Sequence, residues 1–517
     1  MIYYLFIEAL LAAFFACLFW SVYKDYGGIK NGVRRLLLLA VLAIVFKSSW
    51  GYMFYGLEYE DAYAFAFSAR QFSNNIFSSS FLVDGITIGS LDYPVSVGCY
   101  GGHFITFPVY LSNFFRLFGY SEGVMAWAQL LTMYFVLVLL SLFDARGRRW
   151  MIAPIVYCMA PMMNVFGTSM LGETFSSLVC LSFIYFVANG KSNCFALVAF
   201  FLALLCKREN LILLVVPLCF AVKGCVGKRD RNYRSVFLQI VGYVAVCAIY
   251  FLCIKNVFSI EALESKDIQA STFSLAYFRQ LFPVFGEALL NLKCFGIVCY
   301  ATVLLLIYQS ISRTITTRQV VFGVLYLGYL LLYTSHYRGY GFVHGLEEAS
   351  EFMSFRYLNN FYYLLALILC DAKLPLSRRL VSMGGGVLLL ISIVFTINTR
   401  KNLSEEEYLY NFRECSDVAN LISEMGSKKY IVLTDRILTY QVTMPPWFNV
   451  CDIRNIGNLN PNVRGYDFFI VYQDDFSYLQ KRYGVNVDTS RIIKLKQINN
   501  NRYLYKYDIT AEDISAK

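Results

Sequence analysis

Long apolar runs constrain the fold of this chain more than any other feature. Apolar residues make up 58% of its 517 positions and charged residues only 15%, whereas a soluble domain averages about 45–50% and about 25%. A helix of about 20 consecutive apolar residues crosses a bilayer. The pattern therefore predicts a polytopic α-helical membrane protein with about twelve transmembrane helices. The runs are Tyr3–Val22, Leu36–Tyr55, Glu122–Phe143, Trp150–Phe166, Leu171–Ala188, Cys194–Cys206, Leu211–Val222, Val236–Ile254, Cys294–Gln309, Val320–Tyr333, Tyr357–Cys370 and Val381–Ile397.

Basic residues collect in alternate short loops between these runs. The positive-inside rule assigns such loops to the cytoplasm. Both termini and the long loops Gly56–Ser121, Lys255–Lys293 and Ser335–Arg356 are then expected on the extracytoplasmic face. The net charge of +10 thus indicates orientation in the membrane and no nucleic-acid partner. The basic loops contain Lys24, Lys30, Arg34 and Arg35; Arg146, Arg148 and Arg149; Lys191; Lys223, Lys228, Arg229, Arg231 and Arg234; Arg313 and Arg318; and Lys373, Arg378 and Arg379.

The N-terminal run and the cysteines are consistent with this interpretation. The first run begins at Ile2 with neither a basic segment nor a small-residue cleavage site, so we expect a retained helix. Most of the 15 cysteines lie inside apolar runs, where they act as small hydrophobic residues. Cys415 and Cys451 lie outside the runs and are a candidate disulfide pair in an oxidising compartment. No Cys/His spacing typical of a metal site occurs.

The composition changes near residue 400, where the chain becomes charged and rich in asparagine. We therefore expect a transmembrane domain over residues 1–400, with interfacial helices in its loop 56–121, and an extracytoplasmic domain over 401–517. Strands that alternate with helices predict a small α/β fold. No glycine-rich phosphate-binding motif occurs there, which favours a binding or capping role. The expected elements are helices Glu405–Met425 and Asp474–Tyr483, and strands Tyr430–Thr434, Phe468–Tyr472, Arg491–Gln497 and Arg502–Tyr507.

An acidic cluster opens the first outer loop. Glu58, Glu60 and Asp61 follow the second apolar run directly. A carboxylate at the membrane–water boundary is desolvated, and this raises its pKa. Such a group is a candidate general base for an acceptor hydroxyl. The alternative is structural, with Asp61 capping a helix over Ala62–Phe72.

Two further polar residues lie on the expected outer face. Residues 101–119 predict an amphipathic helix lying in the interface, and His103 near its start could contact a phosphate or have a structural role. Glu173 begins the fifth apolar run. A helix cap is its default interpretation unless another residue pairs it with Asp61.

Cations are unexpected at two outer positions. Lys207 and Arg208 form an outer hairpin with Glu209, against the charge bias of the other short outer loops. An anionic ligand explains them, and so does snorkelling to lipid phosphates with local pairing to Glu209. Arg356 begins the eleventh run beside Tyr357 and lies at helical spacing from Glu351, so a local ion pair is its alternative role.

The order of these features resembles the GT-C glycosyltransferases. The residues that carry the resemblance are Glu60-Asp61-Ala62-Tyr63, then Ala69-Arg70, then Gly102-His103 with a Pro108-to-Leu111 run ending in Phe118-Gly119. Within that superfamily the chain is similar to protein mannosyltransferases and to the aminoarabinose transferase that modifies lipid A. The resemblance covers roughly residues 35 to 400.

The resemblance implies roles for individual residues. Asp61 or Glu60 would be the base, and Glu173 a second active-site carboxylate. The lipid phosphate would be held by residues drawn from Arg70, His103, Lys207, Arg208, Arg356 and Tyr357.

The resemblance also implies a reaction. A sugar would move from a polyprenyl-phosphate donor to a glycan, lipid or protein acceptor on the extracytoplasmic face, with inversion at the anomeric carbon. The resemblance assigns no particular cofactor, and a divalent metal stays open because Asp61 and Glu173 could ligate one if they converge. The chain departs from the family at Phe104-Ile105, where two prolines are common, and at Glu60, where aspartate is common.

Two other functions were weighed. An O-antigen polymerase or ligase carries large arginine-rich outer loops and no acid cluster after an early helix. A transporter is expected to show ionisable residues at mid-membrane and a repeat of helices, and this sequence shows few of the former and none of the latter. A glycosyltransferase of a plasma membrane, in bacteria the inner membrane, is therefore the function that the sequence favours.

Overall fold

The computed structural model divides the chain into two compact units. The first comprises Met1–Gly56 and Phe104–Asn402, and the second Leu57–His103 and Leu403–Lys517. The residues that the structure describes are 2–28, 31–48, 60–75, 81–83, 86–88, 105–144, 150–160, 172–220, 233–254, 275–292, 294–335, 357–371, 384–395, 397, 408–427, 430–435, 440, 449–458, 466–499 and 501–508.

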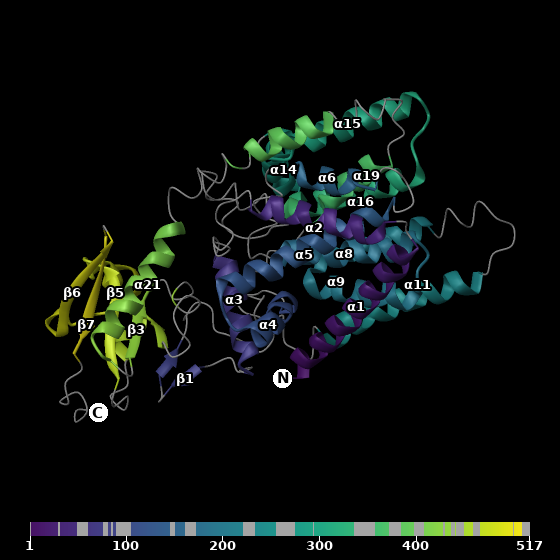
Figure 1. The fold of residues 1–517 in the computed structure, drawn as a ribbon. Helices are drawn as coiled ribbons and strands as arrows, with labels where there is room; N and C mark the ends of the chain where they lie inside the picture. The colour runs from purple at the N-terminus through teal and green to yellow at the C-terminus, as the bar shows by residue number, and fades with distance from the viewer. Residues whose placement is uncertain are drawn as a thin grey trace. The chain divides into compact units, whose positions relative to one another are not determined.

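The first unit is a bundle of helices (Figure 1). In the described part of this unit, α8 lies at the centre, because every residue from Glu173 to Phe186 is buried. The described elements of this unit are α1 (Ile2–Gly27), α2 (Gly32–Ser48), α4 (Thr106–Phe118), α5 (Glu122–Leu142), α6 (Ile152–Cys158), α8 (Gly172–Ala188), α9 (Asn193–Cys206), the 3-10 helix η1 (Arg208–Leu214), α11 (Tyr233–Ala248), the π-helix η2 (Ile249–Ile254), α14 (Leu275–Leu290), α15 (Gly296–Ile311), α16 (Thr317–Ser335) and α19 (Tyr363–Cys370).

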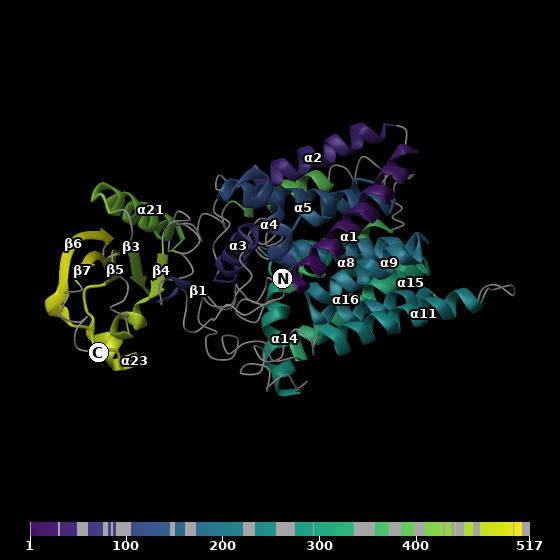
Figure 2. The same cartoon turned by 90° about the horizontal axis from the view of Figure 1, so that it is seen from below.

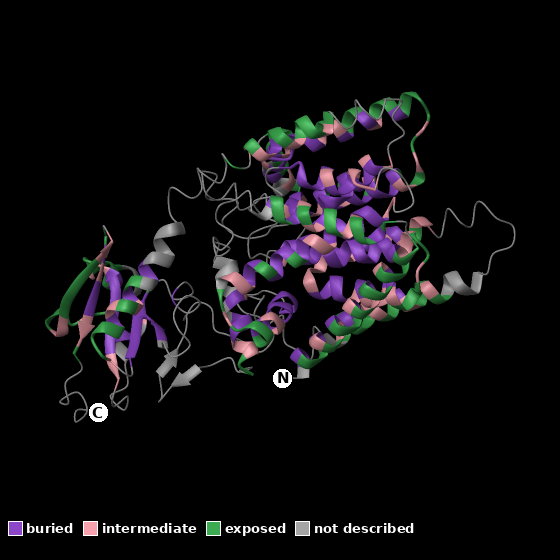
Figure 3. Ribbon diagram, viewed as in Figure 1, coloured by how far each residue is buried: buried purple, intermediate pink, exposed green. Residues whose placement is uncertain are grey.

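Large apolar side chains cover the outside of this bundle. Trp20 on α1, Val244 on α11 and Leu304 on α15 are 60%, 62% and 67% exposed, and Figure 3 shows the exposed faces of these helices. Large apolar side chains exposed on several helices of one bundle are more typical of a surface that faces lipid tails than of a soluble monomer. The surface is therefore that of a polytopic helical membrane protein.

Helix lengths agree with the expected twelve spans only in part. Among the described residues, Tyr3–Gly27 and Gly123–Leu142 are long and apolar enough to cross a bilayer alone, and the remaining apolar helices are shorter. One reason is local breakage, since α9 ends at Cys206 and a 3-10 turn follows. The number of spans stays a prediction.

The helix expected in the interface is more buried than its amphipathic pattern suggested. Helix α4 buries Thr106 to Ser112 and Phe115, and it packs against α1, α5 and α9. Its exposed residues gather at its end, at Leu117 and Phe118. The helix is therefore part of the bundle core as well as of its boundary.

The second unit contains a five-stranded mixed sheet in the order β4-β3-β5-β7-β6. Strands β3 and β4, and β3 and β5, are parallel, whereas β7 is antiparallel to β5 and β6. The unit contains α3 (Glu60–Ser73), β1 (Phe81–Val83), β2 (Ile86–Ile88), α21 (Tyr408–Glu424), β3 (Tyr430–Thr434), β4 (Asn449–Asp452), the 3-10 helix η3 (Ile453–Asn458), β5 (Asp467–Gln473), α23 (Ser477–Tyr483), the 3-10 helix η4 (Thr489–Arg491), β6 (Ile492–Asn499) and β7 (Arg502–Tyr507).

The first outer loop is grouped differently from its expected place in the transmembrane domain. Residues 57–103 cluster with the C-terminal residues. The antiparallel hairpin of β1 and β2 explains this grouping, because β2 lies next to β4, the edge strand of the sheet.

Two separate hydrophobic cores cover the two faces of the sheet, with α21 on one side and α23 on the other (Figure 2). Cys415 on α21 belongs to the first core and Cys451 on β4 to the second. The structure shows no disulfide between them. The expected disulfide between them is therefore wrong, because the sheet separates the two side chains.

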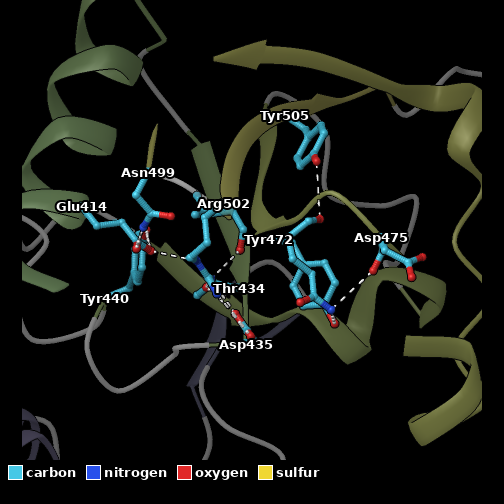
Figure 4. Close-up of polar contacts among 11 residues, drawn as sticks. Glu414, Thr434, Asp435, Tyr440, Tyr472, Asp475, Asn499, Arg502 and Tyr505 are labelled. Atoms are coloured by element: carbon cyan, nitrogen blue, oxygen red, sulfur yellow. Dashed lines mark hydrogen bonds and ion pairs between the residues drawn. The ribbon is translucent and has the colours of Figure 1, made fainter. Parts of the chain in front are cut away.

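A buried ionic cluster joins α21 to β7 in this unit (Figure 4). Arg502 Nε lies 3.0 Å from Glu414 Oε1, and Arg502 Nη2 lies 2.6 Å from Asp435 Oδ1. Tyr440 and Asn499 donate hydrogen bonds to Glu414, each at 2.7 Å. Burial alone would lower the pKa of Arg502, but the hydrogen bond and charge of Asp435 and the charge of Glu414 raise it above its usual value.

Removing this arginine is expected to destabilise the second unit. In Arg502→Met, Glu414 stays buried without a counter-charge, which costs about 3–5 kcal/mol. Denaturant should then expose the buried thiol of Cys415 at a lower concentration, as measured by peptide-resolved labelling of the full-length protein. The control is Arg491→Met, whose exposed pair with Asp488 should contribute little. Equal midpoints for both variants would contradict a stabilising role for the cluster.

Candidate functional site

The structure describes the side chains of only some of the predicted site residues. Glu60 and Asp61 form the start of α3, and only their backbone is described. Arg70 lies later in α3 and is buried. His103 and Arg356 lie outside the described residues. Glu60, Asp61, Arg70 and His103 belong to the second unit. The site residues whose contacts the structure describes belong to the first unit.

The centre of the site is an ion pair between Glu173 and Lys207. Lys207 Nζ lies 2.8 Å from Glu173 Oε1, and the two side chains are only 13% and 7% exposed. Glu173 is the second residue of α8, where the helix dipole favours a negative charge. The carboxylate expected to be a simple cap thus pairs with a cation 34 residues away.

A break in the helical backbone presents Lys207. Helix α9 ends at Cys206, and Lys207 is extended with φ −157° and ψ 135° before η1 begins. From this extended position the lysine reaches Glu173 on α8. Non-helical backbone in a membrane protein is tolerated where it is buried in protein or lines a water-filled cavity.

An aromatic ring forms the second contact of Lys207. Its Nζ lies 4.8 Å from the centroid of the Tyr357 ring, which is within range of a cation–π interaction. The sequence named Tyr357, beside Arg356, as a candidate to hold the lipid phosphate. The structure shows that it contacts Lys207 itself.

Parallel aromatic rings hold Tyr357 in place. Tyr333 stacks on Tyr357 at 5.5 Å and on Phe361 at 5.8 Å, and Phe361 stacks on Tyr329 at 5.2 Å. Sequence reasoning missed Tyr329, Tyr333 and Phe361. The sequence pattern that could have revealed them is a four-residue spacing, of Tyr329 with Tyr333 and of Tyr357 with Phe361. This spacing places each pair on one helix face.

Arg208 points elsewhere, although it follows Lys207 directly. Its side chain interacts with Tyr250 in η2 by a hydrogen bond. The two cations of the outer hairpin therefore have different partners, Glu173 for Lys207 and Tyr250 for Arg208.

The described residues contain no group of three His, Cys, Asp or Glu side chains that could hold a metal ion. The divalent metal considered from the sequence would need Asp61 together with Glu173, and the structure describes only the backbone of Asp61.

Comparisons with known proteins identify the fold. No family model matches the chain, and no curated protein does. Two solved structures of ArnT from Cupriavidus metallidurans match over 92% of this chain and 98% of theirs. The structure bound to undecaprenyl phosphate has a TM-score of 0.57 at 13% identity, and the apo structure 0.53 at 12%. The predicted resemblance to GT-C transferases of this type is thus confirmed for the fold.

Proposed function

We propose that the protein is a membrane glycosyltransferase that takes a sugar from a polyprenyl-phosphate donor. The observation that carries this proposal is the buried contact between Lys207 and Glu173 in a fold whose solved example binds undecaprenyl phosphate. Glu173 supplies the counter-charge of this buried lysine, and a cation on the expected outer face, against the charge bias of the short loops, suits a further anion that comes with a ligand. In a transferase of this type the anion that arrives is the donor phosphate.

The ion pair suits reversible capture of a phosphate. An ammonium group has three donors, and Glu173 and the ring of Tyr357 account for only part of its surroundings. Glu173 holds the Lys207 ammonium in place before the donor binds. The phosphate then takes the remaining donors, where a fixed cation stabilises the charge that develops as the phosphate leaves. Glu173 therefore acts through Lys207 in this proposal.

The transfer itself is a single displacement with inversion. Asp61, or Glu60, accepts the proton of the acceptor hydroxyl, and the acceptor oxygen forms a bond to the anomeric carbon. The bond from that carbon to the phosphate oxygen breaks, and polyprenyl phosphate leaves with the electron pair. Arg70, His103, Arg208 and Arg356 remain candidates to contact the phosphate.

Incubation with radiolabelled polyprenyl-phosphate sugars tests the proposal. We expect the purified protein to release polyprenyl phosphate from at least one such donor and to transfer the label to a membrane glycan, lipid or protein. Release only from nucleotide-sugar donors would contradict it.

The proposed reaction takes place on the extracytoplasmic face. This orientation is supported by the basic residues of the short loops, among them Lys191 between α8 and α9. The second unit and Lys207 then face outward.

Thiol labelling in intact cells checks the orientation. Cys194 is exposed and follows the loop of Lys191, whereas Ser490 is exposed in the second unit. In a cysteine-depleted background, a membrane-impermeant maleimide should label Ser490→Cys in intact cells and Cys194 only after permeabilisation. The reverse pattern would contradict the assigned face.

A further inference from the structure

Asn210 lies fully buried three residues after Lys207. Its Nδ2 donates to Ser176 Oγ at 3.1 Å and to the carbonyl oxygen of Ala203 at 2.8 Å. Its Oδ1 accepts from Tyr329 Oη at 2.9 Å and from Asn360 Nδ2 at 3.2 Å. A carboxamide offers two donors and two acceptor lone pairs, so every capacity of this side chain is used. The amide therefore connects α8, α9, α16 and the turn before α19.

The contacts of Asn210 repeat those of Lys207 one turn deeper. Glu173 and Ser176 lie three residues apart on α8, and residues with this spacing share a helix face. Lys207 and Asn210 have the same spacing where the chain enters a 3-10 turn, with three residues per turn. The charged pair of Glu173 and Lys207 is thus followed inward by the neutral pair of Ser176 and Asn210.

The amide also supports the backbone break that presents Lys207. The last carbonyls of a helix lack intrahelical partners, and in a membrane protein these groups need internal ones. Thr106 Oγ1 donates to the carbonyl oxygen of Leu205 at 2.6 Å. The carbonyl oxygen of Ala203 accepts from the backbone N–H of Lys207 at 3.0 Å and also from Asn210 Nδ2, and the backbone N–H of Asn210 donates to the Lys207 carbonyl at 3.1 Å. The side chain of Asn210 thus binds the same carbonyl that holds the Lys207 backbone.

Both partners of Lys207 are linked to this amide. Ser176, one turn after Glu173, accepts from Asn210, and Tyr329 belongs to the stacked rings that end at Tyr357. A displacement of Asn210 would therefore act on the lysine, its carboxylate and its aromatic neighbour together.

We propose that Asn210 is a positioning residue for phosphate recognition, which it serves by holding the Lys207 ammonium in the geometry that receives the lipid phosphate. This role rests on the proposed function, because it presumes that Lys207 binds the donor phosphate. A residue that only stabilised the fold would weaken binding of charged and neutral lipids alike. A positioning residue lowers the preference for the charged lipid.

The test compares undecaprenyl phosphate with undecaprenol, which shares the chain and lacks the phosphate. Native mass spectrometry of the full-length protein in detergent gives both dissociation constants. The dissociation constant of undecaprenol divided by that of undecaprenyl phosphate reports phosphate recognition. We expect Asn210→Ala to lower this ratio about tenfold, equivalent to about 1.4 kcal/mol. Binding of undecaprenol should stay close to that of the unchanged protein.

A matched control is a second buried amide. Gln309 on α15 is fully buried and accepts a hydrogen bond from Gln319 Nε2 at 2.8 Å. Gln319 lies near the start of α16, whereas Tyr333 lies near its end, about 21 Å away at 1.5 Å per residue. Gln309→Ala should therefore keep the ratio of the unchanged protein.

The outcomes separate the two proposals. A ratio near one in the unchanged protein would contradict phosphate recognition and hence the proposed function. A high ratio that persists in Asn210→Ala would contradict the positioning role alone. If Asn210→Ala does not yield folded protein, the same ratio is measured for Ser176→Ala, which removes one hydrogen-bond partner of the Asn210 side chain. A fall in the ratio smaller than the one expected for Asn210→Ala supports the positioning role, and an unchanged ratio overturns it.

Discussion

Replacing Lys207 by methionine is expected to lower the affinity for undecaprenyl phosphate about a hundredfold, equivalent to about 2.7 kcal/mol. Truncating one member of a buried, hydrogen-bonded charge pair costs about 2–5 kcal/mol, and Lys207 is 13% exposed at its contact with Glu173. The affinity for undecaprenol should change little, because the isoprenoid chain does not need the cation. Both constants are measured on the purified protein in detergent.

Loss of the lysine leaves Glu173 buried without a counter-charge, so the single variant also risks instability. The double variant Lys207→Met with Glu173→Gln removes both charges. It should recover a normal yield of folded protein and still fail to distinguish the phosphate from the alcohol. Recovery of phosphate binding in the double variant would contradict the role of Lys207.

The bundle contains a matched control for this prediction. Lys191 Nζ lies 2.5 Å from Asp25 Oδ1 and 5.6 Å from the centroid of the Tyr185 ring, so it combines the same three types of group. It belongs to a loop that the charge pattern assigns to the cytoplasm. Lys191→Met should leave the preference for undecaprenyl phosphate unchanged. An equal loss in both variants would indicate a general effect on the bundle.

Replacing Asp61 by asparagine is expected to abolish sugar transfer while the protein stays folded and binds its donor. A general base contributes about 10²–10⁴-fold to a rate, and asparagine has a similar shape but cannot accept the proton of the acceptor hydroxyl. Turnover of a labelled polyprenyl-phosphate sugar measures the loss, and binding of undecaprenyl phosphate shows that the donor site is intact.

The neighbouring acid provides the control. Glu60 and Asp61 are consecutive in α3, and consecutive residues point in different directions on a helix. Glu60→Gln should therefore retain most of the activity. Full activity of Asp61→Asn with loss in Glu60→Gln would transfer the role of base to Glu60.

Much of the second unit could be predicted from local sequence. Strands β3 and β7 have the predicted bounds, because β-branched and aromatic residues dominate β3 and tyrosine occupies every second position of β7. Strand β4 was missed since its four residues, Asn449–Asp452, carry a weak local signal and are fixed by pairing with β3. The sequence also could not show that Cys415 and Cys451 lie on opposite sides of the sheet, because this depends on tertiary packing.

The site could be predicted in parts. Lys207 was conspicuous because a cation on the expected outer face opposes the charge bias, and Glu173 because an acid opens an apolar run. Their pairing could not be derived, because it depends on how α8 packs against the break after α9. Asn210 was missed since a single amide at the edge of an apolar run resembles an ordinary helix end. The catalytic and phosphate-binding roles of these residues remain predictions.

The most direct test of the account is an experimental structure of the full-length protein with undecaprenyl phosphate. The account predicts the phosphate within hydrogen-bonding distance of Lys207 Nζ, about 2.7–3.2 Å, with Glu173 and Tyr357 still beside the lysine. A bound phosphate that contacts other cations while Lys207 remains paired only with Glu173 would contradict it.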